Sequence, residues 1–301
     1  MEGIMMVGPK RTVAAFCDEE GNISTEEISV PRLTKQYPLL GKPFIRGIFN
    51  FGSSLANGVK ALMFSAEFYP EDGEEPEETS KFEQWLDDKL GDKLGPIITA
   101  ISMVLGVGLA ILLFMYLPSL VSKFISKFVH LSAFGKNLIE GILKIAIFIG
   151  YTALTALTKD IRRTYEYHGA EHKTIACYEH EEELTVENVK KYTRFHPRCG
   201  TSFIFLVLFI SIFVNTIFRV SWASILLRVV IKIALLPIVT GIAYELIRLA
   251  GKYDNIFTKI ISAPGLWIQR ITTSEPDESQ IECAIAALKA CIPENKEDDK
   301  W

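Results

Sequence analysis

An uncharged apolar stretch, residues 96–122 (PIITAISMVLGVGLAILLFMYLPSLVS), limits the folds open to this chain more than any other feature. About 20 consecutive apolar residues are enough for a helix to cross the hydrocarbon core of a bilayer, and this stretch is longer. Residues 138–157, 203–220 and 223–249 are also long and mostly apolar. The sequence therefore predicts a mainly α, polytopic membrane protein with about four transmembrane helices.

The overall composition agrees with a membrane protein that carries water-exposed segments. Of the 301 residues, 49% are hydrophobic, yet 23% are charged and the net charge is only −4. The pattern along the chain divides it into six segments. These are a β-meander (1–36), an amphipathic interfacial helix with an acidic loop and a lead-in helix (37–95), a transmembrane hairpin (96–157), a His/Cys loop (158–202), a second hairpin (203–250), and an interfacial segment with a C-terminal amphipathic helix (251–301).

Several charged residues lie inside the predicted spans, where each needs a partner. Glu140 and Lys144 are one helical turn apart and can pair. Arg228 is expected to extend outward to the headgroups, and Lys232 to pair with a carbonyl group or with Glu140. Glu245 is expected to pair with Arg248 or Arg162. An alternative is that these groups line the polar cavity of a transporter, for which four spans are few.

The segments that flank the predicted spans allow further structural predictions. Residues 254–273 are expected to lie in the membrane interface and to be broken at Pro264–Gly265. Residues 276–292 predict a helix with one apolar stripe, which needs either the N-terminal segment or another protein as its partner. The acidic stretch 69–80 is interpreted as a solvated loop.

Lysine and arginine in the short loops predict the orientation of the chain. The loop 158–201 carries eight of them, whereas the loop 123–136 carries three. Because such residues accumulate on the cytoplasmic side, we expect the His/Cys loop and both termini to be cytoplasmic. The five cysteines include no C-x-x-C pair, so we expect reduced thiols, mostly buried as small hydrophobic groups.

The sequence HGAEH (168–172) holds two of the five histidines of the chain. On a helix, His168 and His172 share one face, so both imidazoles can bind one ion. Glu171 lies at the edge of that face, where it can accept a proton from water. The spacing H-x-x-E-H is the inverted zinc-peptidase signature. A structural alternative is that two polar residues share a helix face without a ligand.

A catalytic zinc ion needs a third protein ligand and an open position. His196 and Cys199 occur at the far end of the same loop, and Glu245 is an alternative oxygen ligand near the cytoplasmic end of the last span. Imidazole and thiolate groups favour Zn²⁺ or another divalent transition metal over Mg²⁺ or Ca²⁺. No basic and aromatic surface indicates a nucleic-acid partner.

At YHGAEHKTI (167–175) and HPRCGTSF (196–203), the chain resembles the YqhQ-type family of bacterial membrane proteins. The resemblance extends to PFIRGI (43–48) and YELIR (244–248), but Val7 stands where the family pattern has a basic residue. It implies a multi-pass protein of the bacterial inner membrane and a predicted metal-dependent enzyme. The metal-binding positions that it implies are His168, Glu171, His172, His196 and Cys199.

Two classes of function follow. The first is a metal-dependent membrane hydrolase with Glu171 as general base, in which Lys173 and Arg198 stabilise an oxyanion or hold an anionic group. Its substrate would be a membrane-proximal peptide or a lipid headgroup. The second is a non-enzymatic accessory factor for membrane-protein assembly that docks on a translocon or ribosome. Either protein has the lipid bilayer as a partner, and either can form a homo-oligomer.

Overall fold

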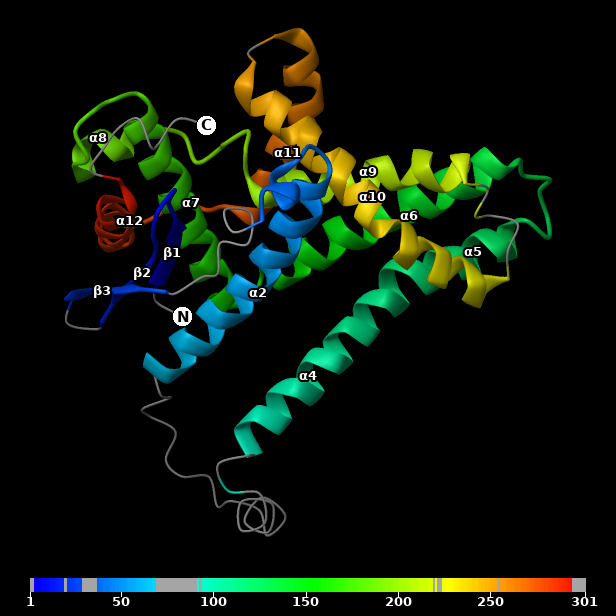
Figure 1. Cartoon of the computed structure of the whole chain (residues 1–301), viewed down its shortest axis with the longest axis horizontal. Helices are drawn as coiled ribbons and strands as arrows, with labels where there is room; N and C mark the ends of the chain where they lie inside the picture. The colour runs from blue at the N-terminus through cyan, green and yellow to red at the C-terminus, as the bar shows by residue number, and fades with distance from the viewer. Residues whose placement is uncertain are drawn as a thin grey trace. The chain divides into compact units, whose positions relative to one another are not determined.

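The computed structural model describes residues 3–18, 21–28, 37–68, 91, 94–218, 220, 224–253 and 255–293 (Figure 1). The chain is mainly helical with one small sheet, as predicted. It divides into two units. Unit 1 comprises Met1–Phe68, Phe148–Ser211 and Leu236–Trp301, and unit 2 comprises Tyr69–Ile147 and Ile212–Leu235. The predicted acidic loop 69–80, and the lead-in helix apart from residues 91, 94 and 95, lie outside the described residues.

The predicted N-terminal β-meander is confirmed in unit 1. Strands β1 (Gly3–Val7), β2 (Thr12–Cys17) and β3 (Ile23–Glu27) form an antiparallel sheet in the order β1-β2-β3. All residues of the central strand β2 are buried, whereas β3 is largely exposed. The sheet therefore needs a further element to cover the apolar side chains of β1 and β2.

Helix α12 (Glu278–Cys291) provides that cover, so the predicted apolar stripe finds its partner within the chain (Figure 1). Ile281 and Ile285 join a buried core with Ile4 and Met6 of the sheet. Helix α7 (Lys159–Glu179) contributes Tyr167, Ala170 and Cys177 to the same core. All five cysteines are buried, in line with the sequence expectation, and none of them is in a disulfide. The short helix α8 (Val186–Lys190) adds Val189.

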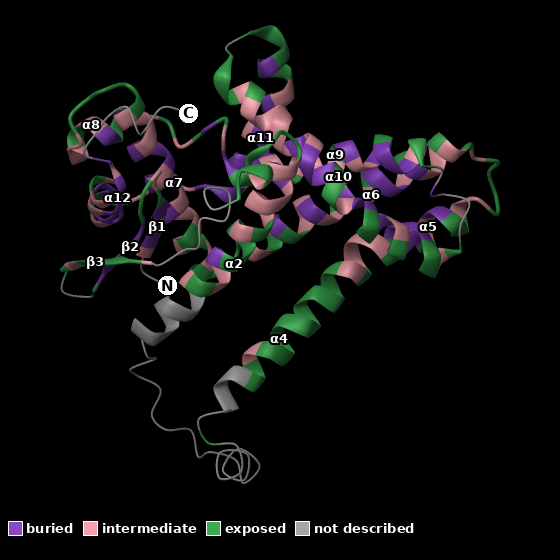
Figure 2. Ribbon diagram, in the orientation of Figure 1, coloured by how far each residue is buried: buried purple, intermediate pink, exposed green. Residues whose placement is uncertain are grey.

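Four helical stretches are long and apolar enough to cross a membrane, which matches the predicted number. They are Ile97–Ile125, formed by α4 (Leu94–Ile111), the π-helical turn η3 (Leu112–Tyr116) and α5 (Leu117–Ile125); α6 (Ala133–Thr155); α9 (Gly200–Ile217); and α10 (Ile225–Lys252). Nearly all of the described part of α4 is exposed (Figure 2). Such apolar exposure fits a helix that faces lipid hydrocarbon.

Two further helices of unit 1 lie on either side of these spans in the sequence. Helix α2 (Ile45–Phe68) follows the short turn η1 (Pro38–Gly41) and packs on α9 and α10, with the rings of Phe51 and Phe203 5.6 Å apart. Helix α11 (Ile256–Thr272) continues through Pro264, so the predicted break is wrong. Proline removes one helical hydrogen bond but does not end this helix, because residues on both sides of Pro264 are buried in packing contacts. Gly265 allows close packing of α11 on Ser202, because a Cβ at this position would lie 2.3 Å from Ser202 Oγ.

The charged residues of unit 2 pair across helices. Glu140 of α6 forms ion pairs with Arg228 and Lys232 of α10, and all three residues are buried. The expected Lys232–Glu140 pair is therefore confirmed. Two other expectations are wrong: Glu140 does not form an ion pair with Lys144, and Arg228 is buried rather than extended to the headgroups. A carboxylate in an apolar environment is stabilised most by cations that are buried with it.

Candidate metal centre

His168 and His172 lie one turn apart on α7, with ring centroids separated by 4.4 Å. Each ring is held by a backbone carbonyl group. His168 Nδ1 lies 2.8 Å from the Thr272 oxygen, and His172 Nδ1 lies 2.7 Å from the Arg194 oxygen. Because a carbonyl oxygen only accepts, both Nδ1 atoms must carry a proton. In each neutral ring the lone pair is therefore on Nε2, as in most histidines that bind a metal.

Cys199 immediately precedes α9 and brings its thiol to these rings. His168 Nε2 lies 3.2 Å from Cys199 Sγ. One ligand atom from each of His168, His172 and Cys199 lies within 4.8 Å of the others. The Thr201 backbone N–H points at Sγ from 3.4 Å, as expected for an acceptor at a helix N-terminus. Two residues of one helix and one residue 27 positions after His172 therefore converge.

The electrostatics of this group favour the thiolate. Burial alone would raise the pKa of Cys199, but hydrogen bonds and charge interactions with His168 and His172 outweigh it and lower the pKa to about 4. Burial would lower the pKa of His168, but the interaction with Cys199 raises it to about 9. The Cys199 sulfur is thus an anion at neutral pH, and the thiolate is the form that binds metals.

The separation of His168 Nε2 and Cys199 Sγ is compatible with a shared transition-metal ion. Zinc binds nitrogen at about 2.0–2.1 Å and sulfur at about 2.3 Å, so tetrahedral coordination separates two such ligand atoms by about 3.5 Å. The observed 3.2 Å between His168 Nε2 and Cys199 Sγ is close to this value. Three protein ligands leave one position for water or substrate, which is the arrangement of catalytic rather than structural zinc sites.

His196 is close to this group, but its ring nitrogens are already engaged. The ring centroids of His172 and His196 are 5.6 Å apart. His196 Nδ1 accepts the Arg198 backbone N–H at 3.3 Å, and Nε2 lies 3.4 Å from the Glu179 carboxylate. Burial lowers the pKa of His196, so the ring is neutral at pH 7 and Nε2–H is the donor. This arrangement makes His196 a neighbour of the three ligands rather than a fourth one.

The three predicted catalytic residues, Glu171, Lys173 and Arg198, lie near the cluster but differ in their contacts. Glu171 is half-buried, and within the described residues its carboxylate makes no hydrogen bond or ion pair. Its charge acts on His168 and His196. Arg198 pairs with Glu179, and Lys173 pairs with Glu275 at 2.8 Å. Glu171 is therefore available for proton transfer, whereas Lys173 has a structural partner.

Glu245, the alternative oxygen ligand, is occupied elsewhere. Both of its carboxylate oxygens pair with Arg46 of α2, and the Phe44 backbone N–H donates to it at 3.1 Å. It does not belong to the group formed by His168, His172 and Cys199. The expected pairing of Glu245 with Arg248 or Arg162 is therefore wrong: its partner is Arg46, which is 199 residues away in the sequence. Glu245 is therefore not part of the ligand set.

The sequence pattern did not indicate the residues that hold the cluster in place. Gln269 of α11 is fully buried, and its side-chain amide bonds the backbone of His196 in both directions, at 2.8 and 2.7 Å. Thr272, one turn further on, supplies the carbonyl group that orients His168. Arg194, whose carbonyl group orients His172, donates to the Thr273 carbonyl oxygen. Residues at the end of α11 and directly after it therefore position His168, His172 and the loop that carries Cys199. An uncharged glutamine in an apolar helix gives no local sequence signal of this role.

A Gln269→Leu variant is expected to bind zinc 10- to 100-fold more weakly than the wild type, since residues that orient metal ligands commonly have effects of this size. Leucine has a similar volume but leaves the His196 backbone without its two partners. Competition with a chromophoric chelator would measure the affinity. Ser202→Ala is the matched control because it removes only the third bond of Gln269, at 3.0 Å. Equal zinc affinity in Gln269→Leu and the wild type would contradict the orienting role.

Two comparisons place the chain among known proteins. A family model described as "Protein of unknown function (DUF1385)" matches residues 42–294. The chain belongs to this family. It is also 35% identical over 293 residues to "Uncharacterized protein YqhQ" of Bacillus subtilis (strain 168), covering 97% of this chain and 90% of that protein. No solved structure matches. The resemblance drawn from the HGAEH and HPRCGTSF motifs is thereby confirmed, and the family carries no assigned function.

Proposed function

We propose that the protein is a metal-dependent hydrolase of the bacterial inner membrane that holds Zn²⁺, or another divalent transition metal, with His168, His172 and Cys199. One observation carries the proposal. Two separate backbone carbonyl groups accept the Nδ1–H of the two imidazoles, so Nε2 is the ligand atom of each ring beside the Cys199 thiolate, once His168 Nε2 has lost its proton on metal binding. A pair of histidines that merely shared a helix face would not need this arrangement.

The roles of the chain's own residues follow from their positions. A bound zinc ion supplies Lewis-acid chemistry, polarising a water molecule and a substrate oxygen. Glu171, adjacent to His172 and without a fixed partner among the described residues, accepts the proton of the attacking water. Arg198 directly precedes Cys199 and pairs with Glu179, and its guanidinium would hold an anionic group of the substrate. Lys173 keeps the 273–276 segment on α7 through Glu275.

The eight lysines and arginines of the loop 158–201 support a cytoplasmic position for this centre and for both termini. Because α9 follows Cys199 directly, the substrate would lie at the membrane surface. A lipid headgroup or a membrane-proximal peptide is the class of substrate that can reach such a position.

A Glu171→Gln variant is expected to keep its metal and to lose hydrolysis by about 10²- to 10⁴-fold, the usual contribution of a general base. The assay need not assume a substrate. Vesicles containing the protein would be incubated with a bacterial lipid extract or membrane-peptide digest in ¹⁸O-water, and mass spectrometry would detect products with one ¹⁸O atom. Glu187→Gln, an exposed change on α8, is the control.

A metal-loaded protein that yields no ¹⁸O-labelled product from either mixture would contradict the hydrolase. In the accessory-factor alternative, the cluster is a rigid polar hub and the protein co-purifies with a translocon or ribosome. That co-purification, unaffected by Glu171→Gln, would replace the enzymatic proposal.

A further inference from the structure

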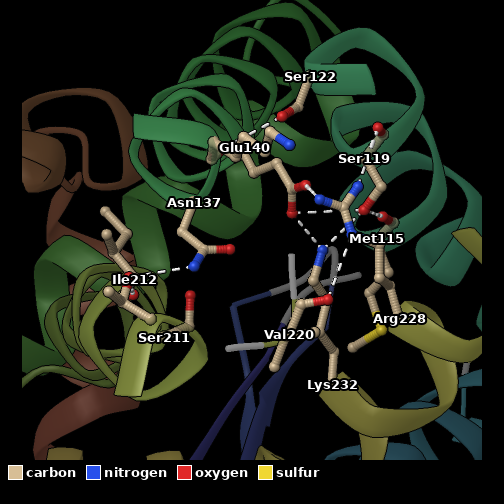
Figure 3. A network of polar contacts seen from close by, with 12 residues as sticks. Met115, Ser119, Ser122, Asn137, Glu140, Ser211, Ile212, Val220, Arg228 and Lys232 are labelled. Atoms are coloured by element: carbon tan, nitrogen blue, oxygen red, sulfur yellow. Dashed lines mark hydrogen bonds and ion pairs between the residues drawn. The ribbon is translucent and has the colours of Figure 1, made fainter. Parts of the chain in front are cut away.

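Unit 2 contains a second polar cluster, unrelated to the metal centre, around Glu140 (Figure 3). Glu140 Oε1 lies 3.1 Å from Arg228, and Oε2 pairs with Lys232. Lys232 also donates to Ser119 Oγ at 2.7 Å. Glu140, Arg228, Lys232 and Ser119 are each at most 5% exposed. The side chains of α5, α6 and α10 therefore converge on one buried polar point.

The charges at this point do not balance. Glu140 is the only acidic residue in the described part of unit 2, residues 94–147, 212–218, 220 and 224–235. It is buried with three cations: Arg228, Lys232 and Lys144, which is 6% exposed. Lys144 is close enough to Glu140 and Lys232 to interact with both electrostatically. One negative charge and three positive charges give this cluster a formal excess of two positive charges.

Much of the donor capacity in the cluster is also unused. Within the described residues, Lys144 makes no hydrogen bond or ion pair. Besides its ion pair with Glu140, Arg228 has only long contacts, at 3.4 Å to the Val220 carbonyl oxygen and 3.5 Å to the Ser119 carbonyl oxygen. Buried cations with unused N–H groups are complementary to an anion with several acceptor oxygens.

We infer that this cluster binds a phosphate group, carried either by an anionic phospholipid or by free phosphate. Lys232 lies seven residues from the start of α10, which is about 10 Å along the helix axis. Lys144 lies further along α6, but long side chains on a helix point back towards its N-terminus. The site is thus within reach of the membrane–water boundary at the ends of α6 and α10 where these helices begin. It does not depend on the proposed hydrolase, because none of its residues belongs to unit 1.

Two measurements on the full-length protein test this inference and separate the sources. Native mass spectrometry would follow lipid retained from nanodiscs of phosphatidylglycerol or phosphatidylcholine, and equilibrium dialysis would follow radiolabelled inorganic phosphate in detergent. We expect one phosphate group per chain in one of the two experiments. Retained phosphatidylglycerol identifies a lipid site, and bound inorganic phosphate identifies a soluble ligand. Lys144→Met is expected to weaken that binding at least 10-fold, whereas Lys144→Arg keeps it.

Lys123→Met is the matched control, because Lys123 is an exposed lysine on α5 in the same unit. It should leave the binding unchanged. The inference is overturned if the wild type holds neither phosphatidylglycerol nor phosphate at one per chain. It is also overturned if Lys144→Met binds the ligand as the wild type does, or if Lys123→Met weakens binding as much as Lys144→Met.

Discussion

A His172→Ala variant is expected to lose stoichiometric metal while the protein remains folded. The substitution removes one of three ligands, and two ligands do not hold a transition-metal ion against a weak chelator. Alanine is the best helix former, so α7 should persist, although the Arg194 carbonyl oxygen loses its donor at a cost of about 1–3 kcal/mol. Elemental analysis of detergent-purified protein should give one metal ion per wild-type chain and almost none for the variant. Circular dichroism would confirm that the helices remain.

His180→Ala is the appropriate control, since His180 is exposed and directly follows α7. Its metal content should equal that of the wild type. A wild-type protein that neither retains a metal nor takes up added zinc would contradict the metal centre. The remaining interpretation would then be an ion pair between the Cys199 thiolate and the His168 imidazolium, which the pKa values of about 4 and about 9 favour without a metal.

The second large effect concerns the buried carboxylate of unit 2. A Glu140→Ala variant is expected to be destabilised by about 3–5 kcal/mol, because it leaves Arg228 and Lys232 buried without their counter-charge. Unfolding in mixed micelles by titration with SDS would measure the change in the free energy of unfolding. In the double variant with Lys232→Met, one of the unpaired charges is removed, so its destabilisation should be smaller than the sum of the single effects.

Glu27→Ala provides the comparison with an exposed ion pair. Glu27 and Arg11 are 3.9 Å apart, and both side chains are mostly exposed, so the expected loss is below about 1 kcal/mol. Equal losses in the free energy of unfolding for Glu27→Ala and Glu140→Ala would contradict this prediction. They would show that the buried charges of unit 2 stabilise the fold no more than an exposed ion pair does. Strictly additive effects of Glu140→Ala and Lys232→Met would contradict their coupling.

The elements of the fold could be predicted because they depend on local periodicity. The uncharged stretch before Ser122, the alternating strands and the apolar stripe of α12 each indicate an element within a short window. The boundaries of the spans differ from the sequence pattern where charged residues lie among apolar ones. Helix α6 begins at Ala133 rather than 138, and it includes Glu140, whose partners lie on another helix. Proline at 264 suggested a break because the packing of its neighbour Gly265 cannot be read from the sequence.

The candidate site could be predicted only in part for the same reason. The spacing of His168 and His172 on α7 follows from helical geometry, and the hypothesis that Cys199 joins them agrees with the structure. His196 is oriented differently from the three ligands, and this orientation depends on Gln269. Gln269 is 73 residues away in the sequence and hydrogen-bonds the His196 backbone. Contacts between residues so far apart in the sequence produce no local sequence pattern. Metal binding itself remains a prediction.

The packing of α12 on the N-terminal sheet sets the order in which the protein is assembled during translation. Cys283 of α12 and Ala15 of β2, which are in contact, are 268 residues apart. At about 5–20 residues per second, the ribosome needs roughly 13–54 s to make the intervening chain, including every predicted span. Throughout that interval the apolar face of β1 and β2 lacks α12, and of the described helices in the same core only α7 and α8 are made before it. A newly made chain must therefore keep this face from aggregating until its last helix emerges.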